Sequence, residues 1–390
     1  MNAGGMRVAT SFTSIAIGLS SLSLAAQTWP QWLVSGPSPQ RSSMSVACSG
    51  DLGTLVAAGT PGAYVSTDFG ATWQLRGPGS YWDVVCSANG RSMILSDNGI
   101  LGTLVSTNSG STWKQLPLFY DAATSADGRK MVGVGGSTCY LTRDFGATWS
   151  TNNIWSPHPG CFLQCVASSA DGNTLVGGSY MNTVYVSTNS GATWEPTTAP
   201  QRDWWIAACS VDGTHFAAVA DDVPSTMWVS TNSGITWNQA SFPGGHQNNL
   251  FPAVGFSADD SRLVEVVDDS SVWSSVDGGA TWTMVLGTIT NGPGANVAFS
   301  SNADKFVGCG YGLIYTAGIL PSLDIRHSGE NLMLSWPTPL VTSNTALQYA
   351  PDLRGTNWFA VTNQPTSTNG RSTVALPVSG GVGFYRLHLQ

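Results

Sequence analysis

Two aspartates of this chain occupy equivalent places in two similar segments, Tyr81-Trp-Asp and Phe119-Tyr-Asp. The equivalence predicts that Asp83 and Asp121 lie at the mouths of neighbouring strands and face the same space. Such a pair can share a proton, bind a cation or serve as the acid and base of a glycoside hydrolase. The favoured interpretation is simpler, namely two loop carboxylates that are solvated or bonded to amides.

Aromatic residues gather in the same connections. Flat apolar rings stack on sugars or peptide groups, and carboxylates accept hydrogen bonds from hydroxyls and amines. Trp82, Tyr120 and Trp205 share one position of the repeat, which favours packing. Trp155, Tyr180 and Trp204 lie in less regular loops and are favoured as ligand contacts. The full predicted ligand-binding set is Tyr81, Trp82, Asp83, Tyr120, Asp121, Trp155, Tyr180, Trp204, Trp205 and Tyr311.

Metal and cofactor chemistry has weaker support. The pairs Asp221-Asp222 and Asp268-Asp269 fall on corresponding loops and offer oxygen ligands for calcium, although a solvated acidic rim is the favoured interpretation. His158 and His246 are lone loop histidines without a second ligand nearby in the sequence. We expect no cofactor.

One eight-residue segment, of the type Ser-Thr-Asp-Phe-Gly-Ala-Thr-Trp, recurs six times along the chain. We expect the structure built from this repeat to position the candidate site residues. The Asp or Asn oxygen can accept turn amides, the Gly can adopt a positive φ, and the Trp can pack between sheets. The copies are Ser66–Trp73, Ser106–Trp113, Thr142–Trp149, Ser187–Trp194, Ser230–Trp237 and Ser275–Trp282.

A second short element, of the type Ser-Ala-Asp-Gly, recurs seven times between apolar runs, as a hairpin turn would. Each unit therefore comprises four strands, such as 82–87, 92–95, 103–107 and one that begins at Trp113. Four strands in each period are typical of a β-propeller blade.

The six segments resemble the Asp-box, or BNR, motif of sialidases, sortilin-type receptors, xyloglucanase-type hydrolases and photosystem II assembly factors. The resemblance implies an all-β propeller over about residues 28–318. Sialidases of this group need an arginine triad, a Tyr nucleophile and a Glu, but the propeller has only Glu195 and Glu265, and Glu195 is expected on an outer strand. The assembly factors and sortilin-type receptors bind proteins or peptides without chemistry of their own.

Seven turns but six boxes predict a seven-bladed ring, whose last blade is completed by an N-terminal strand near Thr28-Trp29; a six-bladed ring is the alternative. We expect the propeller over residues 27–318 and a small Ig- or fibronectin-like sandwich over residues 319–390. The closing segment resembles C-terminal modules of secreted planctomycete and verrucomicrobial proteins. Residues 1–26 resemble a cleaved signal peptide.

Composition and net charge restrict the classes of partner that this chain can bind. The chain has 390 residues, a formal net charge of -8 and no Lys/Arg cluster, which argues against nucleic acid and anionic membranes as partners. We expect no membrane span in the mature chain. Of seven cysteines, Cys139, Cys161 and Cys165 can supply one disulfide. The resulting prediction is a secreted or cell-surface protein that binds a glycan or an extracellular protein without catalysis, with a glycoside hydrolase as the alternative.

Overall fold

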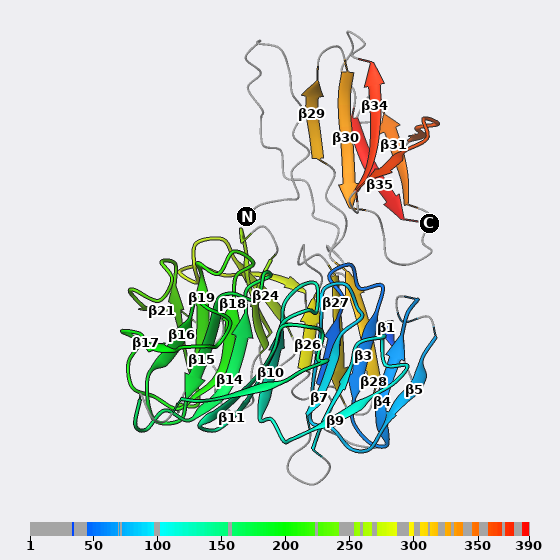
Figure 1. Cartoon of the computed structure of the whole chain (residues 1–390). Coiled ribbons are helices and arrows are strands. Elements are labelled where there is room, and N and C mark those ends of the chain that lie inside the picture. The colour runs from blue at the N-terminus through cyan, green and yellow to red at the C-terminus, as the bar shows by residue number, and fades with distance from the viewer. Residues whose placement is uncertain are drawn as a thin grey trace. The chain divides into compact units, whose positions relative to one another are not determined.

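A computed structural model divides the chain into two compact units, one of residues Trp29–Ile319 and one that contains Leu320–Gln390 (Figure 1). The predicted signal peptide lies outside the described residues. The structure describes residues 33–34, 45–68, 70, 72–96, 102–154, 158–222, 225–241, 253–257, 260–266, 271–286, 296–299, 305–310, 313–318, 324–328, 331–337, 345–350, 358–368, 371–377 and 384–389.

Six antiparallel sheets of the larger unit are each built from four consecutive strands, with the Asp box between the third and the fourth. The first three sheets are β2 (Ser45–Cys48), β3 (Leu55–Ala58), β4 (Gly62–Ser66), β5 (Gln74–Pro78); β6 (Asp83–Cys86), β7 (Met93–Ser96), β8 (Thr103–Ser106), β9 (Lys114–Leu116); and β10 (Asp121–Thr124), β11 (Met131–Gly135), β12 (Thr138–Thr142), β13 (Ser150–Asn153). The next three are β14 (Leu163–Ser168), β15 (Leu175–Ser179), β16 (Val184–Ser187), β17 (Glu195–Pro196); β18 (Trp204–Cys209), β19 (Phe216–Ala220), β20 (Thr226–Ser230), β21 (Asn238–Gln239); and β22 (Ala253–Phe256), β23 (Leu263–Val266), β24 (Val272–Ser275), β25 (Thr283–Leu286).

One further sheet of this unit is composite. It combines β26 (Asn296–Phe299), β27 (Lys305–Gly310) and β28 (Leu313–Gly318) with β1 (Leu33–Val34) from the other end of the chain. The register pairs Leu33 with Thr316 and Val34 with Tyr315. An early segment therefore supplies the fourth strand of the last sheet.

The first strands of successive sheets contact one another from β2 and β6 through to β22 and β26, and β26 in turn contacts β2. Sheets arranged in this way around their first strands form a β-propeller, so the prediction of an all-β propeller is confirmed. Glu195 lies on the fourth strand β17 and is exposed, as the sequence predicts.

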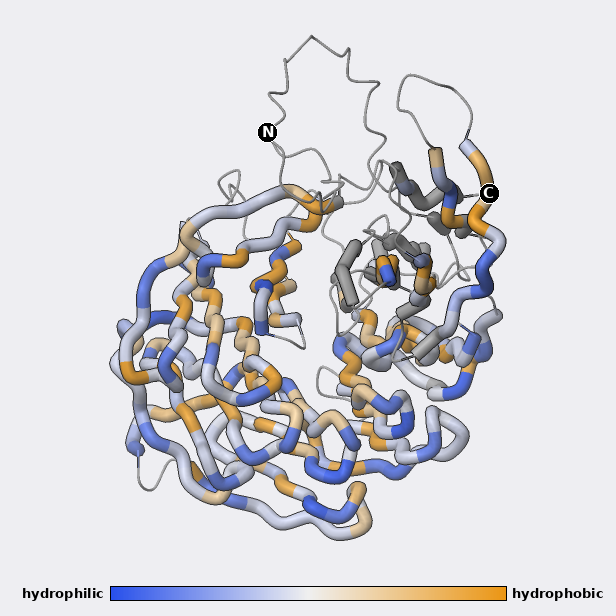
Figure 2. Tube along the Cα trace, turned by 90° about the horizontal axis from the view of Figure 1, so that it is seen from above, coloured by the Kyte–Doolittle hydropathy of each residue, from blue (hydrophilic) through white to orange (hydrophobic). Residues whose placement is uncertain are grey.

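The hydrophobic core lies between neighbouring sheets. In Figure 2 the hydrophobic residues, in orange, gather along interior strands, while blue stretches follow the outer turns. Box tryptophans occupy these layers: Trp194 belongs to the cluster shared by the sheets of β10–β13 and β14–β17, and Trp237 to the next cluster along. Each of these two boxes therefore joins its own sheet to the preceding one, as its Trp predicts.

The box turn satisfies its own backbone. Asp144 accepts the N–H of Thr148 at 2.9 Å and the Thr148 hydroxyl at 2.6 Å, while Thr142 Oγ1 accepts the N–H of Gly146 at 3.0 Å. Gly146 adopts φ 78°, the left-handed region that glycine tolerates. The N–H of Phe145 bonds to the carbonyl of Arg129 in the turn between β10 and β11 at 2.9 Å. Box turns and first-strand turns thus share one side of the propeller.

The smaller unit contains two sheets. One has β29 (Asp324–Ser328), β30 (Asn331–Pro337), β34 (Arg371–Pro377) and β33 (Thr366–Thr368); the other has β32 (Phe359–Ala360), β31 (Thr345–Ala350) and β35 (Phe384–Leu389). Leu334 and Val374 from the first sheet form one buried cluster with Leu347 from the second. The two sheets therefore share a core.

Candidate functional site

A cavity of about 810 Å³ opens at the starts of five first strands, at the ends remote from their turns. Its walls come from β6, β10, β14, β18 and β22, or from residues just before them, so it lies where these strands converge. The lining residues are Trp82, Asp83, Val84, Val85, Tyr120, Asp121, Phe162, Gln164, Val166, Trp205, Ile206, Ala207, Ala253 and Val254.

Four aromatic side chains of the cavity remain open to solvent. Trp82 is 54% exposed, Tyr120 53%, Trp205 40% and Phe162 38%. The rings of Tyr120 and Phe162 are 5.9 Å apart and tilted by 33°. The sequence favours packing for Trp82, Tyr120 and Trp205, but their exposure leaves part of each ring accessible to a ligand.

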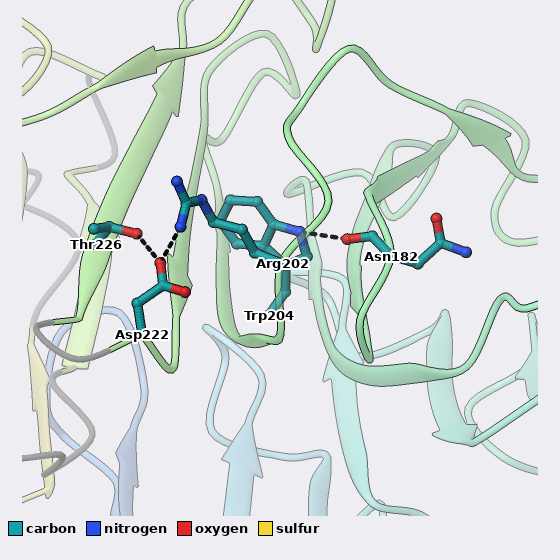
Figure 3. Close-up of polar contacts among 5 residues, drawn as sticks. All are labelled: Asn182, Arg202, Trp204, Asp222 and Thr226. Carbon is teal, nitrogen blue, oxygen red and sulfur yellow. Dashed lines mark hydrogen bonds and ion pairs between the residues drawn. The ribbon is translucent and has the colours of Figure 1, made fainter.

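Two residues of the predicted binding set belong to the core instead. Tyr81 is 3% exposed and Trp204 is fully buried. Trp204 packs in the layer between two sheets, and its Nε1–H donates to the carbonyl of Asn182 at 2.9 Å (Figure 3). Each of the two is directly followed by an exposed aromatic residue, Trp82 or Trp205.

The two aspartates do meet in the cavity, where the charge of Asp83 acts on the Asp121 carboxyl group. Asp83 accepts the Ser45 hydroxyl at 2.8 Å. Asp121 accepts the N–H of Ala122 at 2.7 Å and, across to the next sheet, the N–H of Val166 at 2.8 Å. Burial, and then the charge of Asp83, raise the pKa of Asp121 well above 3.8, although the two backbone bonds oppose the shift. The pair can therefore hold one proton between two carboxyl groups.

The side-chain amide of Gln164 lines the same cavity as the two aspartates. Gln164 Nε2 donates to Asp203 Oδ1 at 2.6 Å, and the Asp203 carbonyl accepts the N–H of Asp221 at 2.8 Å. The Gln164 side chain is thereby fixed between the sheets of β14 and β18. It presents hydrogen-bonding groups beside the exposed aromatic rings.

A second pocket, of about 620 Å³, adjoins the first and shares Phe162 and Gln164 with it. Tyr180, 44% exposed, and Met181, 69% exposed, form much of its wall. Met181 has φ 47°, an uncommon backbone state for a residue with a long side chain. Tyr180, predicted as a ligand contact, therefore lines this outer pocket rather than the cavity of Asp83 and Asp121.

One of the predicted calcium ligands, Asp222, has other partners in the structure. Asp222 Oδ2 forms an ion pair of 2.6 Å with Arg202 Nη1 and accepts the Thr226 hydroxyl at 2.6 Å (Figure 3). The Arg202 guanidinium also lies 5.7 Å from the centre of the Trp228 ring. Asp222 is thus engaged in joining structural elements. Burial, with the charges of Asp203 and Asp222, raises the pKa of Asp221.

Other candidates from the sequence have structural roles or are not described. His158 Nε2 lies 2.6 Å from the Trp194 carbonyl, which indicates packing. Cys139, Cys161 and Cys165 are free thiols, and burial raises the pKa of Cys139 to about 12. Trp155, His246, Asp268, Asp269 and Tyr311 lie outside the described residues.

One cluster that the sequence did not suggest is Asp212, His215 and Asp260, whose ligand-type atoms lie within 4.8 Å of one another. It lies at the turns, away from the cavity. Asp212 already accepts bonds from Ser210 and Thr214, and Asp260 accepts the N–H of Val211. These bonds account for much of the cluster without a metal ion.

The comparisons with known proteins agree with this architecture. Residues 64–75 match the model of the BNR/Asp-box repeat. The chain therefore contains an Asp-box repeat within a β-propeller fold. A comparison of its sequence with curated proteins found no match.

Three solved structures resemble the Asp-box propeller. A GH74 xyloglucanase from Xanthomonas campestris is 15% identical with TM-score 0.57, over 79% of this chain and 60% of that one. An ancestral GH74 enzyme is 14% identical with TM-score 0.52, over 80% and 54%. YCF48 from Cyanidioschyzon merolae is 16% identical with TM-score 0.52, over 74% and 98%. The chain therefore spans less than two thirds of each hydrolase, and at these identities the likeness establishes the fold alone.

In the described part of the Asp-box propeller protein, no helix has the length and apolarity that a membrane crossing requires.

Proposed function

We propose that this chain is a secreted binding protein without catalytic activity, which holds a carbohydrate in the cavity at the starts of the first strands. One observation carries the proposal: four partly exposed aromatic side chains surround two carboxyl groups and an amide in a single concave site. Rings provide stacking surface, and Asp83 and Gln164 provide hydrogen-bond partners for hydroxyls.

The shape of the site favours a small ligand over a protein surface. A volume of about 810 Å³ falls in the range of sites that enclose drug-sized molecules, roughly 300 to 1,000 Å³. Protein partners usually cover wider surfaces, about 800 Å² on each side. A peptide or protein ligand is therefore the competing outcome of the experiment.

A glycoside hydrolase is the second candidate, because the raised pKa of Asp121 is what a catalytic acid needs. The bonds of the Asp121 carboxyl group oppose it. Its two oxygens accept the N–H groups of Ala122 and Val166, at 2.7 Å and 2.8 Å, so both are already engaged with the backbone of the propeller.

A glycan array probed with the purified protein tests the proposal, followed by calorimetry with Tyr120→Ala. We expect retention of neutral glycans and a loss of about tenfold in affinity for the variant, the effect of one aromatic contact. Ile235→Ala is the matched control, because Ile235 is 68% exposed but lies in a box turn. Retention of peptides alone would overturn the proposal, as would hydrolysis of a retained glycan that Asp83→Asn abolishes.

The same proposal extends to the rest of the chain. Residues 1–26 act as the signal peptide, residues 27–318 form a propeller of seven blades closed by the N-terminal strand, and residues 319–390 form an Ig- or fibronectin-like accessory sandwich. The pairing of β1 with β28 supports the closure, and the core shared by Leu334 and Leu347 supports the sandwich. Edman sequencing of the exported protein tests the cleavage: a start before residue 20 or after residue 33 contradicts it.

A further inference from the structure

The cavity and the outer pocket have two walls in common. Phe162 and Gln164 line both. Phe162 contacts Tyr120 on the side of the cavity, and Tyr180 N–H bonds to the Phe162 carbonyl at 2.9 Å on the other side. A molecule that lies over Phe162 therefore reaches Tyr120 at one end and Tyr180 at the other.

The outer pocket has a rigid wall. The Asn182 carbonyl accepts the Trp204 Nε1–H at 2.9 Å (Figure 3). It also accepts the Arg202 backbone N–H at 2.9 Å. Asn182 Nδ2 donates to the Gly160 carbonyl at 3.2 Å, and Oδ1 accepts the Thr183 N–H at 2.8 Å. The turn is thus fixed by four hydrogen bonds around Asn182 while it presents Met181 to solvent in a left-handed backbone state. Fixed exposed side chains of this kind are typical of binding surfaces.

The chemistry of the two pockets points to one class of ligand. The described lining of the outer pocket consists of two aromatic residues, one methionine, two amides and one glycine, with no carboxylate and no cationic side chain among them. In the cavity the only charged residues among the described lining are Asp83 and Asp121. One proton held by that pair leaves a single negative charge in the cavity, and its described lining has no cationic side chain with which to bind an anionic ligand. Aromatic rings, together with amides and with groups that accept hydrogen bonds from hydroxyls, suit a neutral chain that carries many hydroxyl groups.

We propose that the cavity and the outer pocket form one continuous groove for a linear neutral oligosaccharide, with Tyr180 and Met181 as an outer subsite. The inference rests on the proposed carbohydrate-binding function and adds to it the extent and shape of the ligand. Each pocket alone is large enough for a drug-sized molecule, since both exceed about 300 Å³. A single sugar unit in the cavity would leave the outer pocket unused.

The experiment measures affinity against chain length. Linear cello-, manno- and xylo-oligosaccharides, from disaccharide to octasaccharide, are titrated by calorimetry into the full-length protein and three variants. Tyr120→Ala alters the cavity, Tyr180→Ala alters the outer subsite, and Ile235→Ala is the exposed apolar control in a box turn. All three side chains are exposed, so that folding is expected to be retained, and near-UV circular dichroism checks it.

We expect affinity to rise with length, Tyr120→Ala to weaken every ligand about tenfold, and Tyr180→Ala to weaken only the longer ones by about as much. Equal affinity of the wild-type protein and Tyr180→Ala at every length would overturn the groove while leaving the proposed function intact, provided that Tyr120→Ala still weakens binding. Failure of the wild-type protein to bind any of the oligosaccharides would overturn the groove. The glycan array then decides whether the proposed function falls with it.

Discussion

The raised pKa of Asp121 leads to a prediction about stability. In the unfolded chain Asp121 ionises near 3.8, whereas in the folded protein it keeps its proton to higher pH. Folding therefore takes up a proton between these two pKa values. The free energy of unfolding falls there as pH rises, by up to about 1.4 kcal/mol per pH unit for one proton.

The substitution Asp83→Asn reduces this effect, while burial, the larger cause of the raised pKa, remains. An Asn oxygen still accepts the Ser45 hydroxyl, which lies 2.8 Å from Asp83 Oδ1. Its N–H group can donate to the Asp121 carboxylate, and the negative charge that raised the pKa of Asp121 is gone. Asp121 then ionises at lower pH. The variant gains stability over the wild-type protein as pH rises through the interval, and the gain levels off above the wild-type pKa of Asp121.

Urea unfolding followed by tryptophan fluorescence, between about pH 4 and pH 7, measures the difference. Asp121→Asn is the control. Both Asp121 oxygens accept backbone N–H groups, from Ala122 and Val166, so an amide N–H must face one of these donors. This control loses about 1 to 3 kcal/mol at low pH, and its deficit shrinks as pH rises through the interval, because the titrating carboxyl of Asp121 is absent. A constant difference between Asp83→Asn and the wild-type protein across the range would refute the shared proton.

Three further substitutions test the scaffold. Hydrogen bonds from Thr148 lower the pKa of Asp144 to about 2, so its charged form stabilises the fold above pH 3.8 and loses this effect as pH falls towards 2. Asp144→Asn, which gives this box the Asn that the next box carries at position 189, is therefore less stable than the wild-type protein at neutral pH, and acid titration by circular dichroism should show the difference vanish near pH 2. Trp204→Phe loses the Nε1–H bond to a carbonyl in a fully buried site, which costs about 1 to 3 kcal/mol in urea unfolding. Gly133→Ala places a methyl group 2.2 Å from Phe119 Cδ2, and the overpacking costs about 1 to 3 kcal/mol, measured by thermal unfolding.

The box side of the propeller is the part that the sequence predicts best. Its turns bond to themselves: Asp144 needs only Thr142 and Thr148, which lie within four residues of it. Residues close together in the sequence therefore determine the structure of each box turn. The spacing of the boxes along the chain then predicts the order of the strands.

The binding side is harder to predict because two first strands contain irregularities. The pairing of β14 with β15 shifts between Leu163 and Cys165, and that of β18 with β19 shifts between Trp204 and Ile206. An extra residue changes which side chain faces the cavity. Gln164 enters the cavity for this reason, although the sequence does not single it out, while Trp204, predicted as a ligand contact, turns into the core. The run Trp204-Trp205 in the sequence holds no signal that tells the two apart.

The bonds that shape the binding side also hold the sheets together. Asp121 bonds to Val166 across one junction of sheets, Gln164 to Asp203 across the next, and Trp204 to the Asn182 turn. Stability and binding are therefore coupled on this side, whereas a box turn can change without altering the cavity. Since Trp204 holds the outer wall without being exposed, Trp204→Phe should weaken long oligosaccharides more than short ones although it touches neither. Unchanged affinity for long oligosaccharides would mean that the turn keeps its shape without the indole bond.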